Sequence, residues 1–147
     1  MNTSNPDKIV SRTAVVNAPA KVIFDLLADP RRHNEIDGSR SVQNARNDAP
    51  HRLELGSKFG MEMKIGVAYR ITNTVVEFEE GRRIAWRHVG GHIWRYILEP
   101  VEGGTRVTEQ FDWNTNRAPI MLKVSNALSR NAKSIEKTLE NLQKMYP

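Results

Sequence analysis

The stretch from residue 84 to residue 100, IAWRHVGGHIWRYILEP, gathers residue types that could bind or transform a ligand. Its two histidines could hold a metal ion or move a proton. Its two tryptophans and its tyrosine could instead stack against a planar molecule. The residues around the Gly-Gly pair therefore allow three interpretations: a catalytic cluster, a metal site, or the wall of a binding pocket.

Residues that pair across a β-hairpin share one face of the sheet, so the length of the loop decides which side chains meet. A two-residue loop of Gly90-Gly91 would place Trp94 opposite Arg87. A three-residue loop over 89–91 would instead end in a glycine and place Trp94 opposite Trp86. We predict the three-residue loop, because it gathers the aromatic side chains on one face and leaves the arginines on the other. The predicted pairs are His88 with His92, Trp86 with Trp94, and Ile84 with Tyr96.

The next hairpin adds one acidic side chain to this aromatic face. A four-residue loop over 101–104 pairs Tyr96 with Glu109 and Trp94 with Phe111. A carboxylate in apolar surroundings must be hydrogen-bonded, hydrated or raised in pKa, and the Tyr96 hydroxyl lies within cross-strand reach. Glu109 and Tyr96 are therefore candidate catalytic residues, with Glu109 as a general base for an enolisation or an aldol-type cyclisation. A polar anchor for a ligand and a purely structural pair are the alternatives.

The aromatic face and the helix that follows it predict the lining of a pocket. Aromatic and methionine side chains there would contact an apolar ligand, although each of them taken singly could also be core. The predicted ligand-binding residues are Phe59, Met61, Met63, Trp86, His88, Trp94, Tyr96, Glu109, Phe111, Met121, Val124 and Leu128.

The four histidines fall into two groups. His88 and His92 face each other across the hairpin, but two imidazoles without a third ligand make a weak metal site. We therefore predict no metal and no cofactor, and we place these two side chains at the rim of the pocket. His33 and His51 are predicted to lie on the surface, on a short helix and in a loop.

The elements that position these residues follow from the hydrophobic pattern. Apolar residues spaced every three or four positions predict helices, and alternating apolar residues predict strands. Strands joined by short turns can only form an antiparallel meander. The predicted elements are a strand at 9–16, short helices at 20–29 and 31–36, and strands at 56–65, 69–80, 82–89, 92–99 and 105–113.

A single long helix is predicted from about Pro119 to Met145, where apolar residues recur at helical spacing. At ~1.5 Å per residue, it would be about 40 Å long and could cross a whole sheet. Its apolar stripe thins at Asn131-Ala132, between Leu128 and Ile135. A stripe that thins above a sheet should leave space there.

The 147 residues have the composition of an ordinary soluble domain, with 39% hydrophobic and 27% charged residues. We expect one domain over 1–147, with 1–7 and 146–147 loosely held. The lack of cysteine excludes disulfides and thiol catalysis. No apolar run reaches ~20 residues and no signal-peptide pattern is present, so we expect a cytoplasmic protein without integral membrane association. The net charge is +5, but basic and acidic residues are interleaved, so nucleic acid is not an expected partner.

Three motifs carry a resemblance to a known family. They are VVNAPAKVIFDLLADP, VVEFEEGRRIAW and WRYILEPVEGGTRVTEQFDW. With the order of the predicted elements, they resemble the START-like, or SRPBCC, superfamily, in the group of polyketide cyclases/dehydrases and lipid-transport proteins. The resemblance covers residues 8 to 145.

The resemblance implies an α+β helix-grip fold. In this fold a curved seven-stranded antiparallel sheet wraps around a long C-terminal helix, with two short helices between strands 1 and 2. It also implies a cavity for a small apolar or aromatic molecule, lipid- or polyketide-like, carried or sensed by the protein. A polyketide cyclase/dehydratase-like enzyme using Glu109 and Tyr96 is one alternative, and a protein-interaction module with a filled cavity is another. The superfamily has no common catalytic motif, so fold alone does not choose among them.

Overall fold

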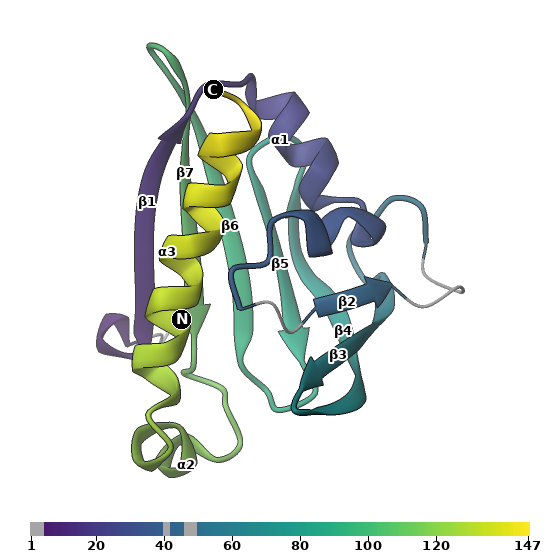
Figure 1. Cartoon of the computed structure of the whole chain (residues 1–147), viewed down its shortest axis with the longest axis vertical. Coiled ribbons are helices and arrows are strands. Elements are labelled where there is room, and N and C mark those ends of the chain that lie inside the picture. The colour runs from purple at the N-terminus through teal and green to yellow at the C-terminus, as the bar shows by residue number, and fades with distance from the viewer. Residues whose placement is uncertain (1–4, 40–41, 46–49) are drawn as a thin grey trace.

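The structure is a computed structural model that describes residues 5–39, 42–45 and 50–147 (Figure 1). Its helices are η1 (Pro6–Lys8), α1 (Ala20–Leu27), η2 (Pro30–Glu35), α2 (Pro119–Val124) and α3 (Ala127–Met145), where η marks a 3₁₀ helix. Its strands are β1 (Ile9–Val16), β2 (Val42–Ala45), β3 (Lys58–Ile65), β4 (Val67–Glu79), β5 (Arg83–His88), β6 (Ile93–Val101) and β7 (Gly104–Asp112).

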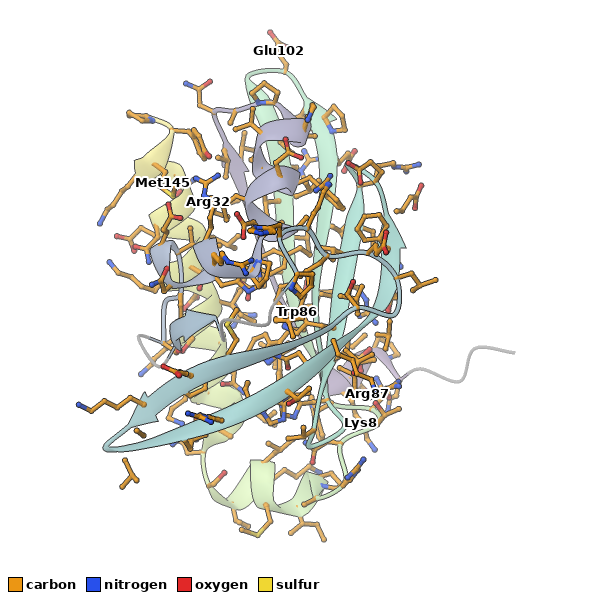
Figure 2. The ribbon with its side chains drawn as sticks, turned by 90° about the vertical axis from the view of Figure 1, so that its right-hand side faces the viewer. Lys8, Arg32, Trp86, Arg87, Glu102 and Met145 are labelled. Carbon is orange, nitrogen blue, oxygen red and sulfur yellow. The ribbon has the colours of Figure 1, made fainter. Side chains whose placement is uncertain are left out.

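Within these residues, seven strands form one antiparallel sheet in the order β1-β7-β6-β5-β4-β3-β2. In Figure 1, α3 lies over the half of the sheet formed by β1, β7 and β6, and it contacts β1 and β7. The helices α1 and η2 lie over the other half, on the same side of the sheet. Figure 2 shows β3 and β4 running diagonally to the other strands, so the sheet is strongly twisted. The predicted α+β helix-grip architecture is confirmed.

The core lies between the sheet and the helices. In α1, apolar side chains at helical spacing turn one face inward, and Ile23 and Leu27 are fully buried. Ile135 and Leu142 on α3 meet them from the other half of the molecule. Near the C-terminus, Tyr146 also packs against this core.

The predicted register of the two central hairpins is confirmed. Trp86 pairs with Trp94, and Tyr96 pairs with Glu109. The backbone N–H of His88 donates to the carbonyl of His92 at 2.9 Å, which closes the three-residue loop. That loop ends in Gly91 with a φ of 95°, a conformation that favours glycine.

The predicted single C-terminal helix is wrong at its start. The chain forms the short helix α2, breaks at Ser125-Asn126, and begins α3 at Ala127. Asn126 has a φ of 63°, in the left-handed region that asparagine tolerates better than most residues. Helical spacing continues through the break, so the hydrophobic pattern alone does not reveal it. The break turns α2 away from the axis of α3 (Figure 1).

The opposite, convex face of the sheet holds a partly buried charge network. Arg95 donates to both carboxylate oxygens of Glu77 and to Oδ2 of Asp112, at distances of 2.7–3.2 Å. The Arg95 side chain is only 12% exposed and that of Asp112 only 8%. The hairpin register that sends Trp94 to the concave face therefore sends Arg95 to the convex face, as predicted, and there Arg95 meets these acids.

Candidate functional site

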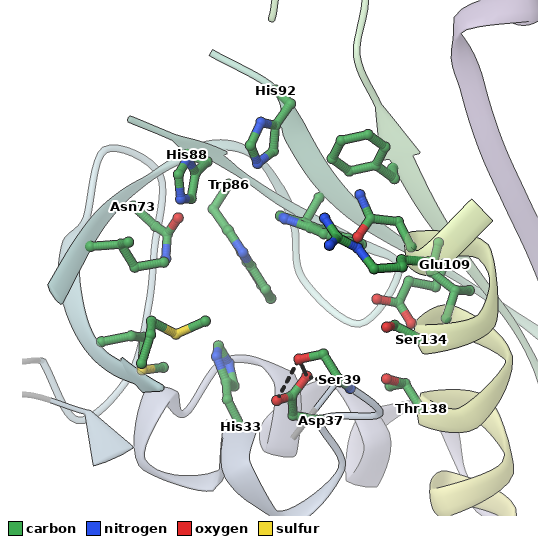
Figure 3. Close-up of a pocket in the computed structure, with 18 of the residues that line it drawn as sticks. His33, Asp37, Ser39, Asn73, Trp86, His88, His92, Glu109, Ser134 and Thr138 are labelled. Atoms are coloured by element: carbon green, nitrogen blue, oxygen red, sulfur yellow. Dashed lines mark hydrogen bonds between the residues drawn. The ribbon is translucent and has the colours of Figure 1, made fainter. Parts of the chain in front are cut away.

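A pocket of about 550 Å³ lies between the concave face of the sheet and α3 (Figure 3). Strands β3–β7 form one wall, η2 and the residues after it form the second, and α3 forms the third. The apolar part of the lining consists of Leu27, Ile36, Met61, Met63, Tyr69, Ile71, Trp86, Trp94, Tyr96, Phe111, Leu122, Ala127 and Ile135. On α3, Asn131 and Ser134 face this space, so it coincides with the predicted thinning of the apolar stripe.

Glu109 projects from β7 into the pocket and is only 5% exposed (Figure 3). Burial raises the pKa of its carboxyl group to about 8; the Tyr96 hydroxyl opposes this shift, and Asp37 adds to it. The Oε1 atom of Glu109 is buried and has no hydrogen-bond partner. At pH 7 the side chain is therefore mostly protonated, and it can both donate and accept a hydrogen bond.

Tyr96 lies opposite Glu109 on β6 and is also buried. Burial and the nearby Glu109 raise the pKa of its hydroxyl group well above 10.0, so the side chain stays neutral. The predicted neighbourhood of Tyr96 and Glu109 is confirmed. Together they place a polar pair on a wall that also carries Trp86, Trp94 and Phe111.

Asn73 on β4 provides a second buried polar atom without a partner. It is 3% exposed, it lines the pocket, and its Oδ1 accepts no hydrogen bond. Sequence reasoning missed this residue because asparagine in a strand is usually on the solvent side. The alternation of side chains along the strand could have located Asn73, because residues two apart share a face. Ile71 and Asn73 both lie on the inner face and line the pocket.

His88 and His92 stack at the rim, with ring centroids 4.4 Å apart. The backbone N–H of Gly90 donates to Nδ1 of His88 at 2.9 Å, so the proton of that neutral ring is on Nε2. The backbone N–H of Ala118 donates to Oδ1 of Asn116, which turns the Asn116 amide nitrogen toward Nδ1 of His92 at 3.0 Å. Both rings therefore accept at Nδ1 and carry a proton on Nε2.

The environment of these histidines keeps them uncharged. Burial lowers the pKa of His88, and burial together with the adjacent His88 lowers the pKa of His92 to about 4. A proton added to either Nδ1 would also replace an accepted hydrogen bond with a clash between two donors. The rim thus presents two neutral imidazole rings.

His33 is buried rather than on the surface, which corrects the prediction from the sequence. Its Nε2 donates to the carbonyl of Leu27 at 2.8 Å, and its ring stacks on Trp86 with centroids 4.9 Å apart. The position of His33 within η2 accounts for this burial. A 3₁₀ helix repeats every three residues, so Pro30, His33 and Ile36 share the buried face. His51 is exposed, as predicted.

Eight of the twelve predicted ligand-binding residues line the pocket, and four do not. Met121 and Val124 are 61% and 72% exposed, because the break before α3 carries them out of the apolar stripe. Phe59 is buried behind Trp86, edge-to-face with it at 5.5 Å. Leu128 packs against the core without facing the pocket.

Two further properties concern only residues 5–39, 42–45 and 50–147. No three or more His, Cys, Asp or Glu side chains of this part come close enough together to hold a metal ion. No helix of this part has both the length and the apolar character that crossing a membrane requires.

A curved antiparallel sheet that grips one C-terminal helix is the helix-grip architecture. Comparison with known families gives the same result and a narrower group. The chain belongs to the family described as polyketide cyclase / dehydrase and lipid transport, whose model matches residues 8–146. The resemblance inferred from the sequence motifs is therefore confirmed.

Among individual proteins, the uncharacterized protein Rv0088 of Mycobacterium tuberculosis is 39% identical over 143 residues. That match covers 93% of this chain, and the chain spans only 63% of the relative's length. A crystal structure of a protein from Rhodobacter sphaeroides matches with a TM-score of 0.73 at 18% identity, covering 98% and 94% of the two chains. The AHSA1-like protein from Aeromonas hydrophila matches with a TM-score of 0.66 at 17% identity, covering 93% of each chain. These structural likenesses concern the fold alone.

Proposed function

We propose that the protein binds a small, largely apolar or aromatic molecule in the pocket between the sheet and α3, as a carrier or sensor. The observation that carries this proposal is the unpartnered Oε1 of Glu109, buried in a pocket of about 550 Å³. A buried polar atom costs free energy unless something hydrogen-bonds to it, and a ligand or water in the pocket can do so. The volume lies within the range of small-molecule sites.

The lining narrows the chemistry of the ligand. Trp86 and Trp94 offer aromatic faces, and Met61 and Met63 offer adaptable apolar contacts. The polar demands are few: a group that pairs with protonated Glu109, and a hydrogen-bond donor for Oδ1 of Asn73. A planar molecule with a carbonyl or hydroxyl group at one end and a donor elsewhere meets these demands. The open volume argues against an interaction module with a filled interior.

The binding proposal is tested with N-phenyl-1-naphthylamine, an aromatic amine whose fluorescence rises in apolar surroundings. We expect Ser134→Phe, which places a ring in the pocket, to weaken binding by about tenfold or more, because it overfills the space. Ser129→Phe on the exposed side of α3 is the matched control and should bind like the wild type. Native mass spectrometry of protein from its own host then identifies a retained molecule. Absence of both probe binding and a retained molecule would contradict the proposal.

An enzyme that enolises a carbonyl compound is the second candidate, and the raised pKa of Glu109 favours it. A general base works best when its pKa is near the working pH, and a value of about 8 meets this condition. The neutral Tyr96 hydroxyl beside it could donate to the carbonyl oxygen. The two candidates share the pocket and differ only in whether Glu109 moves a proton.

Exchange of the α-protons of 2-tetralone in heavy water, followed by NMR, distinguishes the two candidates. Catalysed exchange that rises with pH up to about 8 and falls by about 100-fold or more in Glu109→Gln would favour the enzyme. Tyr96→Phe should lower the rate less, since it removes only a donor. Equal exchange by the wild type and Glu109→Gln would exclude Glu109 as the base and leave the binding proposal standing.

A further inference from the structure

Large apolar side chains are exposed at one end of the molecule. Ile120, Met121 and Val124 of α2 are 73%, 61% and 72% exposed. Val89 in the β5–β6 turn is 52% exposed, and Val67, which follows the β3–β4 turn, is 77% exposed. We call these five residues the apolar end. A soluble protein rarely gathers exposed aliphatic side chains in this way without a partner for them.

Two of the three elements that carry the apolar end, α2 and the β5–β6 turn, are joined through the segment before α2. The Thr115 hydroxyl donates to the carbonyl of Gly91 at 2.6 Å, and the backbone N–H of Arg117 donates to the carbonyl of Gly90 at 2.9 Å. These bonds tie the segment before α2 to the β5–β6 turn. Figures 1 and 2 both show the β3–β4 turn at the same end of the molecule as α2. The five side chains thus belong to one end of the fold.

The charge around this end is positive. The segment 113–135 contains Arg117, Lys123, Arg130 and Lys133 and has no Asp or Glu. The ammonium groups of Lys8 and Lys123 both lie 5.6 Å from the centroid of the Trp113 ring, so the charge continues onto the N-terminal segment. The acids that flank this segment in the sequence, Asp112 and Glu136, form ion pairs with Arg95 and Arg12, which lie outside the segment. They do not balance the basic side chains.

The same helix connects the apolar end to the pocket. On α2, Leu122 lines the pocket while Ile120, Met121 and Val124 are exposed. The break at Ser125-Asn126 separates α2 from α3. A surface that contacts the outer side of α2 would therefore lie within one helix diameter of the pocket, about 10 Å.

We propose that the apolar end docks on an anionic lipid surface. Aliphatic side chains insert at the boundary between headgroups and acyl chains, and basic side chains around them contact negative headgroups. Nucleic acid is the less fitting partner, because its phosphates would contact the basic groups and leave the aliphatic side chains in water. This inference does not depend on what the pocket binds, and it requires no membrane-spanning element.

The full chain is tested by co-sedimentation with vesicles of phosphatidylcholine alone and of equal amounts of phosphatidylcholine and phosphatidylglycerol. We expect binding to the anionic vesicles and much weaker binding to the neutral ones, with a loss at high salt. The double variant Ile120→Ser/Val124→Ser should bind about tenfold or more weakly, because both side chains lose their apolar contact. The double variant Arg117→Glu/Lys123→Glu should bind about 25-fold more weakly, at roughly fivefold for each basic residue.

Matched controls separate docking from general effects. Leu55→Ser removes another side chain that is 65% exposed, and Lys58→Glu reverses a charge at the opposite end of β3; both should bind like the wild type. Circular dichroism melting of each variant checks that it folds. Failure of the wild type to bind anionic vesicles would overturn the proposal, as would equal losses in the controls. Size-exclusion chromatography showing self-association that only the α2 variants abolish, without vesicle binding, would assign this end to a protein partner and also overturn it.

Discussion

Replacing Glu109 by glutamine is expected to stabilise the protein progressively as the pH rises, relative to the wild type. The folded-state pKa of Glu109 is raised to about 8 from an ordinary 4.5. Its contribution to stability is therefore fully present below the unfolded pKa and is lost as the pH rises through the folded pKa. Over about 3.5 units this amounts to about 5 kcal/mol in the free energy of unfolding, as an upper value. Glutamine has nearly the same shape and no such proton to lose.

Urea unfolding of both proteins at pH values from about 4 to about 9 measures this difference directly. Groups other than residue 109 titrate alike in the two proteins and cancel in the comparison. Glu99→Gln is the control, because Glu99 is an exposed carboxylate paired with Arg106, and we expect little change with pH. If the difference in unfolding free energy between the wild type and Glu109→Gln stayed constant from about pH 4 to about pH 9, Glu109 would have to be hydrated. The main support for a functional role of Glu109 in the pocket would then be lost.

Replacing Arg95 by methionine should destabilise the protein by about 3 kcal/mol while leaving probe binding in the folded protein unchanged. The substitution leaves the buried Asp112 without its cationic partner, whereas Glu77 keeps its ion pair with Arg83. An uncompensated buried charge is costly. Arg95 lies on the convex face, so its loss does not alter the lining of the pocket. The expected effect thus falls on stability alone.

Thermal and urea unfolding, with probe binding measured well below the midpoint, check this prediction. Arg87→Met is the matched control, since Arg87 lies on the same face of the adjacent strand but is exposed. It should change stability by less than about 0.5 kcal/mol. Equal losses in the two variants would indicate that the network around Arg95 contributes nothing beyond an ordinary surface charge.

The hairpin positions show what could be predicted from the sequence. Strand side chains alternate with a period of two, so a loop length was enough to place Trp86 against Trp94 and Tyr96 against Glu109. The structure joins Val101 to Gly104 and so shortens the second loop, but the register is the same. The hydrophobic pattern predicted six of the seven strands and missed β2, which is short and has an irregular register against β3. Only the family resemblance predicted a seventh strand.

The predictions that failed depended on local geometry that hydrophobic spacing does not encode. The residues of η2 form a 3₁₀ helix whose buried face carries His33 onto Trp86, and their polar sequence does not indicate which face lies inward. In the C-terminal segment, Asn126 could continue a helix or adopt the left-handed conformation that it takes. The backbone conformation of these two segments thus placed His33 in the site and Met121 outside it.

By itself, the sequence determined the family, the order of the elements and the face on which each strand residue lies, because these depend on periodicity and loop length. The tertiary structure decided which of those residues share an open space. Glu109, Asn73 and Ser134 come from β7, β4 and α3, and the distances between these elements depend on packing across the whole core. The same packing raises the pKa of Glu109, because desolvation is a property of everything that surrounds a side chain.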